Sequence, residues 1–260
     1  MNGGRRGLIG TLAIAAIAAL GLIGCGDDAS ATSPQQVADQ LTGTDTALRQ
    51  AIDEWRAAVD PPSSPPPEEV SAQATDLQDQ VRFLARHPNL TAEVIPLLSG
   101  NVAAEVRGLV AASRALIRLS AGTPSKKFKV GPPPPLAELV SDYDEAKRRI
   151  GIDQHYLAAI HFVETKFGRV KSNSVAGAQG PMQFIPSTWE IYGHGGDIRD
   201  PHDAILGAAR LLRANGAPGR YRRALYAYNP SRLYVAAISQ YAKLIAADPY
   251  GLYFLYCWRP

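Results

Sequence analysis

The sequence predicts a mainly α-helical protein, in which a candidate catalytic region follows a smaller helical part. After residue 33, apolar residues recur at spacings of three, four and seven along most of the chain, which is the periodicity of amphipathic helices. Signals for helix starts and stops bound these apolar stripes. Prolines cluster within residues 61–67 and 132–135, as expected for connections between folded parts.

The charge balance gives no electrostatic reason to expect a nucleic-acid partner. The 260 residues include 27 basic and 24 acidic side chains, a formal charge of +3. Arg5 and Arg6 belong to a terminal segment that we expect to be removed, and 27 − 2 = 25 basic against 24 acidic residues leaves +1. The two cysteines, Cys25 and Cys257, lie at opposite ends of the chain and do not indicate a disulfide framework.

The first 24 residues have the composition of a secretory signal peptide. Arg5 and Arg6 precede an apolar run from Leu8 to Ile23. This run is shorter than the roughly 20 residues of a membrane-spanning helix, so we expect a cleaved signal over residues 1–24 and no permanent helical anchor.

The run ends in Leu22-Ile23-Gly24-Cys25, a tetrapeptide that resembles a bacterial lipobox. The resemblance implies that Cys25 is lipidated and becomes the first residue of the mature chain. The alternative is an ordinary signal peptide with an incidental cysteine. Acyl chains on Cys25 would hold the protein on a bacterial membrane, outside the cytoplasm, and the polar residues 25–33 would form a tether.

Residues 34–121 predict a small helical bundle. Ser33, Pro34 and Gln36 form a helix start with an N-cap, a first-turn proline and a capping-box glutamine. Four apolar stripes follow, and none of them can be buried by its own helix alone. Their positions are Val37, Leu41, Leu48, Ile52, Trp55 and Val59; Val70, Leu77, Val81 and Leu84; the segment from Thr91 to Leu98, which stops at Gly100; and Val102, Val106, Leu109, Ala112 and Leu116.

This bundle offers no chemistry and no readable protein partner. Its acids, such as Glu54, Asp79 and Glu105, are expected on solvated polar faces. Residues 122–135 end in four consecutive prolines and predict a stiff linker. Residues 136–260 would then form the catalytic domain.

Two helices open that domain. The first is expected over Leu136–Ile150. The second has Asp153 as a plausible N-cap and Gly168 as its stop, and it carries Glu164 near its end.

Glu164 is the strongest catalytic candidate. It shares a helix face with Ile160 and Phe167, where a buried carboxyl group is costly unless it has a purpose. Burial and the negative end of the helix dipole both raise its pKa, which suits a general acid. The alternative is that Glu164 points to solvent or pairs with Lys166 or Arg169.

Four sequence blocks around Glu164 occur in the order and spacing of a known family. They are Val163-Glu164-Thr165 with Gly168, Ser174 to Trp189, Asp200 to Ile205, and Ala227 to Pro230. On these blocks, the chain from about residue 136 to its end resembles the lytic transglycosylases of the goose-type-lysozyme-like superfamily, which cleave bacterial peptidoglycan. It looks most similar to the membrane-bound transglycosylase B type. The resemblance implies a lysozyme-like fold and glycan strands of peptidoglycan as substrate.

The resemblance also assigns site residues. It implies Glu164 as the acid, Ser174, Gln183 and Asn229 as polar substrate contacts, and Met182 and Tyr228 as apolar faces of the groove. For Tyr226, Tyr234 and Tyr241 we expect core or rim packing. The chain departs from the family at Thr165, where serine is common, and at Pro181, where an apolar residue is usual.

No second catalytic carboxylate is evident. Asp200 reads as a helix N-cap, with Asp203 in the first turn, and Glu190 reads as a solvated acid. The resemblance implies that Glu164 acts first as acid and then as base, while the 6-hydroxyl of N-acetylmuramic acid closes a 1,6-anhydro ring. The alternatives are a muramidase that uses water on the same bond, and an inactive wall-binding lipoprotein.

Metal and cofactor chemistry is not indicated. The five histidines, His87, His155, His161, His194 and His202, show no ligand spacing. Neither a phosphate-binding loop nor a serine-nucleophile elbow occurs. We therefore expect an enzyme that needs neither a metal nor a cofactor.

Overall fold

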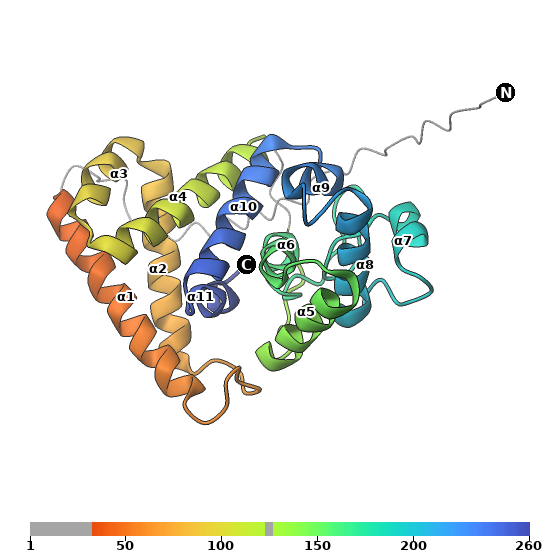
Figure 1. Ribbon diagram of the computed structural model, residues 1–260. Helices are drawn as coiled ribbons and strands as arrows, with labels where there is room; N and C mark the ends of the chain where they lie inside the picture. The colour runs from red at the N-terminus through yellow and green to blue at the C-terminus, as the bar shows by residue number, and fades with distance from the viewer. Residues whose placement is uncertain (1–32, 123–126) are drawn as a thin grey trace.

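The computed structural model describes residues 33–122 and 127–260, and this part of the chain is built from helices (Figure 1). Between the helices, two isolated β-bridges join Val130 to Val170 and Gln179 to Phe184. The prediction of a mainly α fold is confirmed. The elements are α1 (Pro34–Arg56), α2 (Glu68–Arg86), α3 (Pro88–Val94), the 3₁₀ helix η1 (Ile95–Leu97), α4 (Gly100–Ser120), α5 (Leu136–Ile150), α6 (Gln154–Thr165), α7 (Pro186–Tyr192), α8 (Pro201–Ala214), α9 (Tyr221–Tyr228), α10 (Arg232–Ala247) and α11 (Gly251–Cys257).

Helix α1 starts as its sequence predicts. The Ser33 hydroxyl accepts from the Gln36 backbone N–H at 3.2 Å, and the Gln36 side chain accepts from the Ser33 N–H at 2.9 Å. This capping box satisfies two donors that a helix start otherwise leaves unpaired. Five of the six predicted stripe residues are buried, whereas Val59 is exposed because α1 ends at Arg56.

Three other expectations for the N-terminal helices are wrong. The third helix begins at Pro88 and not at the expected Thr91. Proline suits the first position of a helix, because a backbone N–H at that position would have no partner within the helix. Gly100, expected as the stop of the preceding segment, is instead the first residue of α4. Glu105 is buried on α4, at 4% exposure, and its carboxyl group is 2.5 Å from Arg49 of α1. The solvated role expected for Glu105 is therefore corrected, while Glu54 and Asp79 are exposed.

The helices before and after the expected linker share one hydrophobic core. Helix α4 packs along α10, and α2 contacts α11, so residues from both sides of the linker share one apolar cluster. After the linker's undescribed residues 123–126, the backbone pairs with the segment beyond α6: the Lys171 N–H donates to the Lys129 carbonyl at 2.8 Å. The division into domains at residues 122–135 stays a prediction.

Helix α6 lies within the second half of the fold, with α5, α8 and α10 packed against it (Figure 1). It ends at Thr165, three residues before the expected stop. Lys166, Phe167 and Gly168 follow with φ angles of 52°, 58° and 78°, so the chain leaves the helix through three left-handed residues. Asp153 takes the N-cap position, but its side chain accepts from the Tyr221 hydroxyl at 3.0 Å instead of capping the helix.

The predictions about membrane attachment fall outside the described residues. Cys25, the signal peptide and the tether up to residue 32 are not among them. In the part that the structure does describe, no helix combines the length and apolar character needed to cross a membrane.

Candidate active site

Glu164 occupies the last turn of α6 as a buried carboxyl group. Its exposed fraction is 7%, and its Oε1 accepts a hydrogen bond from the Tyr234 hydroxyl at 2.7 Å. Burial raises the pKa of Glu164 to about 8, although the Tyr234 hydrogen bond acts in the opposite direction. Glu164 therefore holds its proton at neutral pH. It forms no ion pair with Lys166 or Arg169 in the described chain, so the solvated or salt-bridged alternative does not hold.

Two stacked tyrosines support this carboxyl group. Tyr234 lies in the first turn of α10, whose N-cap Ser231 accepts from the backbone N–H groups of Leu233 and Tyr234. Tyr228, the last residue of α9, stacks on Tyr234 with ring centroids 6.3 Å apart and an angle of 6° between the rings. Both side chains are 2% exposed, so the packing expected for Tyr234 is confirmed.

The sequence analysis missed the hydrogen bond from Tyr234 to Glu164. The two residues are 70 positions apart, and no local pattern distinguishes this tyrosine from its packed neighbours. The one available signal is its place in the first turn after the Tyr228-Asn229-Pro230 block, where Ser231 fixes the start of the helix.

The turn from Gln179 to Phe184 connects these elements. Paired backbone hydrogen bonds of 2.8 and 2.9 Å close the turn. The Thr165 hydroxyl donates to the Pro181 carbonyl at 2.6 Å, and the Tyr228 hydroxyl donates to the Met182 carbonyl at 2.6 Å. The turn is thereby tied to the end of α6 and to the tyrosine pair that supports Glu164. Retaining a hydroxyl at Thr165 therefore preserves a structural hydrogen bond.

The assigned polar contacts have different surroundings. Gln183 is buried, and its amide donates to the Gly180 carbonyl at 2.9 Å within the turn. The Ser174 hydroxyl accepts from the Ala178 N–H at 2.9 Å, and no hydrogen bond in the described residues joins Ser174 to Glu164. Asn229 is 7% exposed, and its buried Oδ1 has no hydrogen-bond partner in the described chain. This oxygen is a free acceptor beside the tyrosine pair.

The two residues assigned to apolar faces of the groove are enclosed. Met182 is fully buried, and Tyr228 is covered by Tyr234 and Phe184. Neither side chain presents an open surface in this structure. Their assignment as substrate contacts stays a prediction.

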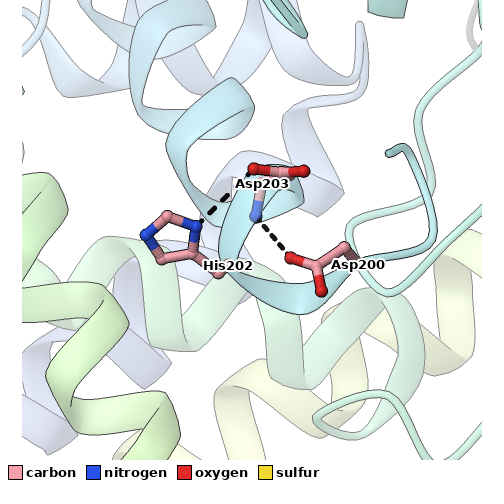
Figure 2. Close-up of side chains that lie close together, drawn as sticks. All are labelled: Asp200, His202 and Asp203. Atoms are coloured by element: carbon pink, nitrogen blue, oxygen red, sulfur yellow. Dashed lines mark hydrogen bonds and ion pairs between the residues drawn. The ribbon is translucent and has the colours of Figure 1, made fainter. Parts of the chain in front are cut away.

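Two of the acids that follow Glu164, Asp200 and Asp203, have structural roles. Figure 2 shows Asp200, His202 and Asp203 at the start of α8. Asp200 Oδ1 accepts from the Asp203 N–H at 3.0 Å, so the predicted N-cap is confirmed. Asp203 Oδ2 accepts from the Asp197 N–H at 2.9 Å, and its Oδ1 is 3.6 Å from His202 Nδ1. Glu190 is exposed on α7.

These three residues also place ligand atoms within 4.8 Å of one another, a spacing that a metal ion can use. However, backbone N–H groups already engage both carboxylates, and His202 Nε2 is 3.2 Å from Glu145. Helix capping explains the cluster without a metal.

The described chain is mainly helical, and Glu164 is buried within it, which is consistent with a lysozyme-like domain. Residues 142–244 match the family model of the Transglycosylase SLT domain. The match runs from α5 into α10 and includes Glu164, Ser174, Gln183 and Asn229. It supports a transglycosylase-type enzyme of the lysozyme-like superfamily that binds peptidoglycan. Searches of curated proteins and of solved structures returned no match to the chain.

Proposed function

We propose that this protein is a peptidoglycan lytic transglycosylase that cleaves the MurNAc-β-1,4-GlcNAc bond and leaves 1,6-anhydro-MurNAc ends. The observation that carries the proposal is the buried Glu164 carboxyl group, which keeps a proton at neutral pH and receives a hydrogen bond from Tyr234. A protonated carboxyl group next to a donor that stabilises its ionised form suits a residue that must both give and take a proton.

In this mechanism Glu164 protonates the glycosidic oxygen as the bond from that oxygen to C1 breaks. The resulting carboxylate is stabilised by the Tyr234 hydroxyl. It then takes the proton of the sugar's 6-hydroxyl, whose oxygen bonds to C1. Glu164 regains its proton and no water is consumed.

Most glycosidases place a second carboxylate opposite the acid, and none is evident among the acids that follow Glu164 in the matched segment, which favours this route over one with a protein nucleophile. Among the described acids of the matched segment, Asp200 and Asp203 are engaged at the start of α8, and Glu190 is exposed. The substrate's acetamido group can then stabilise positive charge at C1.

The polar residues of the matched segment would orient the sugar. By resemblance to the family, Ser174 hydrogen-bonds near the acetamido group, and Gln183 and Asn229 hold hydroxyl groups. The buried Oδ1 of Asn229, which lacks a partner in the described chain, supports its role as an acceptor. Met182 would act through its carbonyl, which fixes Tyr228.

We place the enzyme at a bacterial membrane, outside the cytoplasm, and anchored through a lipid on Cys25 in the manner of the membrane-bound transglycosylase B type. The lipobox-like Leu22-Ile23-Gly24-Cys25 supports this location. Mass spectrometry of the intact membrane-fraction protein tests it. An unmodified Cys25 would refute the anchor without affecting the proposed reaction.

The test of the reaction is mass spectrometry of purified peptidoglycan digested with the wild type, Glu164→Gln and Glu190→Gln. The wild type should release muropeptides with anhydro ends. Loss of a general acid and base should slow release by about 10²- to 10⁴-fold in Glu164→Gln. Glu190→Gln, the matched control on an exposed acid, should act as the wild type does.

Other product patterns would contradict the proposal in distinct ways. Reducing ends would identify a muramidase that uses water. No release by the folded wild type would favour a wall-binding lipoprotein without activity. Equal release by the wild type and Glu164→Gln would remove Glu164 from the mechanism.

A further inference from the structure

The segment of residues 204–247 is strongly basic and contains no acid. It includes no Asp or Glu, whereas the whole chain is close to neutral, with 27 basic and 24 acidic residues. The cationic residues of the segment are Arg210, Arg213, Arg220, Arg222, Arg223, Arg232 and Lys243. These side chains therefore have no acidic neighbours within their own segment, which covers most of α8 and all of α9 and α10.

Four of these arginines gather around α9, which packs against both α8 and α10 (Figure 1). Arg220 directly precedes α9, and Arg222 and Arg223 lie in its first turn. Arg232 is the first residue of α10. The buried residues of α9 are Ala224, Leu225 and Tyr228, and the two arginines of the first turn are exposed on the other side of the helix. We call Arg220, Arg222, Arg223 and Arg232 the arginine surface.

No ion pair within the described residues engages the arginine surface, and all four side chains are exposed. Asp153, an acid next to the start of α9, instead accepts a hydrogen bond from the Tyr221 hydroxyl at 3.0 Å. Like charges that lie close together repel each other, and a surface of one sign attracts ions of the other. The arginine surface is therefore suited to a ligand that carries several negative charges.

The arginine surface borders the candidate active site. Arg232 lies two residues before Tyr234, whose hydroxyl donates to Glu164. Helix α9 leads directly to Asn229, whose buried Oδ1 has no partner in the described chain. At 1.5 Å per residue, the 8 residues of α9 span about 12 Å. An anion joined by a short chain to a sugar at Glu164 is thus within reach of these arginines.

We propose that Arg220, Arg222, Arg223 and Arg232 bind the carboxylates of the peptide stems of peptidoglycan. This inference rests on the proposed function, which brings a glycan strand to Glu164. The stems are attached to the N-acetylmuramic acid whose bond is cleaved, so a strand in the site carries their carboxylates with it. The planar fork of an arginine matches a carboxylate, and exposed forks can follow a flexible stem.

Cosedimentation with insoluble peptidoglycan tests the proposal. The first probe is the purified wall, and the second is the same wall after its carboxyl groups have been converted to neutral amides. The parent protein is Glu164→Gln, which should leave the wall intact. It is compared with the same protein carrying Arg222→Gln and Arg223→Gln, and with a control carrying Arg86→Gln and Arg107→Gln. The control removes two exposed arginines from α2 and α4, so both variants have the same net charge.

The parent and the control should bind the untreated wall equally, and the protein without Arg222 and Arg223 should bind it about three- to tenfold more weakly. On the amidated wall, the parent should bind as weakly as that variant does. Equal binding of all three proteins to the untreated wall would overturn the proposal. It would also be overturned if the parent bound both walls equally.

An anionic membrane is the other polyanion that the arginine surface could meet. Sedimentation with vesicles of phosphatidylglycerol and phosphatidylcholine distinguishes it from the wall. If Arg222→Gln and Arg223→Gln abolish vesicle binding but leave wall binding unchanged, the surface belongs to the membrane and the proposal is overturned. Because cosedimentation needs no turnover, failure of the proposed reaction and failure of the arginine surface give separate results.

Discussion

Burial gives Glu164 its proposed reactivity, and it also raises the free-energy cost of ionising this carboxyl group. Removing a carboxyl group from water disfavours its charged form, so the group holds its proton near neutral pH. Tyr234 limits this shift because its hydroxyl donates to the carboxylate at 2.7 Å. The pKa of Glu164 thus depends on two opposing effects: burial raises it, and the hydrogen bond from Tyr234 lowers it.

Replacing Tyr234 by phenylalanine should disturb that balance. Without the hydroxyl, the pKa of Glu164 rises further, and the carboxylate formed during the reaction loses a charge-assisted hydrogen bond of ~1.5–3 kcal/mol. Activity at neutral pH should fall by roughly ten- to a hundredfold. Since the pKa of Glu164 is about 8, we expect the alkaline limb of the wild-type pH–rate profile near that pH, and the limb should move to higher pH in the variant.

Initial rates on purified peptidoglycan over a range of pH provide the measurement. Tyr226→Phe is the control, because Tyr226 is 49% exposed on α9. A Tyr234→Phe protein with an unchanged rate and an unchanged alkaline limb would separate Tyr234 from the reaction.

At the scale of elements, the turns between helices fix the positions of the side chains near Glu164. The turn from Gln179 to Phe184 joins α6, through Thr165, to α9, through Tyr228. Within it, Gly180 has φ 73°, and a Cβ added there would lie 1.8 Å from the Ile198 carbonyl oxygen. Only glycine fits, because both the backbone angle and the space exclude a side chain.

Gly180→Ala should therefore destabilise the protein more than Gly177→Ala does. Gly177 also has a positive φ, of 82°, but a Cβ there meets nothing within 4 Å, so alanine adds only about 1–2 kcal/mol of backbone strain. Thermal denaturation of the two variants and the wild type measures the difference. Equal losses of stability would show that the contact with Ile198 relaxes without cost.

At the scale of the whole molecule, a buried charge cluster joins the two halves of the chain. Arg49 of α1 contacts Asp45 at 2.9 Å, Glu105 of α4 at 2.5 Å, and Asp248 at the end of α10 at 2.7 Å. Burial, with the nearby charge of Asp45, raises the pKa of Glu105 to about 9 despite the opposing charge of Arg49. Glu105 is therefore protonated at neutral pH.

This protonation predicts how stability depends on pH. The pKa of Glu105 is higher in the folded protein than its ordinary value of 4.5, so the folded state binds the extra proton between about 4.5 and about 9. The contribution of Glu105 to stability thus declines as pH rises through that window. Glu105→Gln, which mimics the protonated acid, should flatten the decline and stabilise the protein near the upper end of the window.

Urea denaturation at both ends of the window measures this effect. Arg49→Met is the opposing variant: it leaves the buried carboxyl groups without their cation and should cost ~3–5 kcal/mol. A stability curve for Glu105→Gln that parallels the wild type would contradict a protonated Glu105.

The sequence by itself determined the features that depend on neighbouring residues. The apolar period gave the helices, Ser33 and Asp200 set helix starts, and Glu164 stood out as an acid on an apolar face. Periodicity shows which face of a helix is buried but not what covers it. The end of α6 was misplaced because Lys166 and Phe167 take left-handed angles that favour glycine.

Only the tertiary structure decided the partners of the buried polar groups. The hydrogen bond from Tyr234 to Glu164 spans 70 residues, the Arg49–Glu105 pair 56, and the Arg49–Asp248 pair 199. Such pairs depend on how α1, α4, α6 and α10 pack together, because a buried charge is tolerable only where packing brings it a partner. The sequence thus singled out Glu164 as an acid on an apolar helix face, and the packing of distant helices supplied its surroundings.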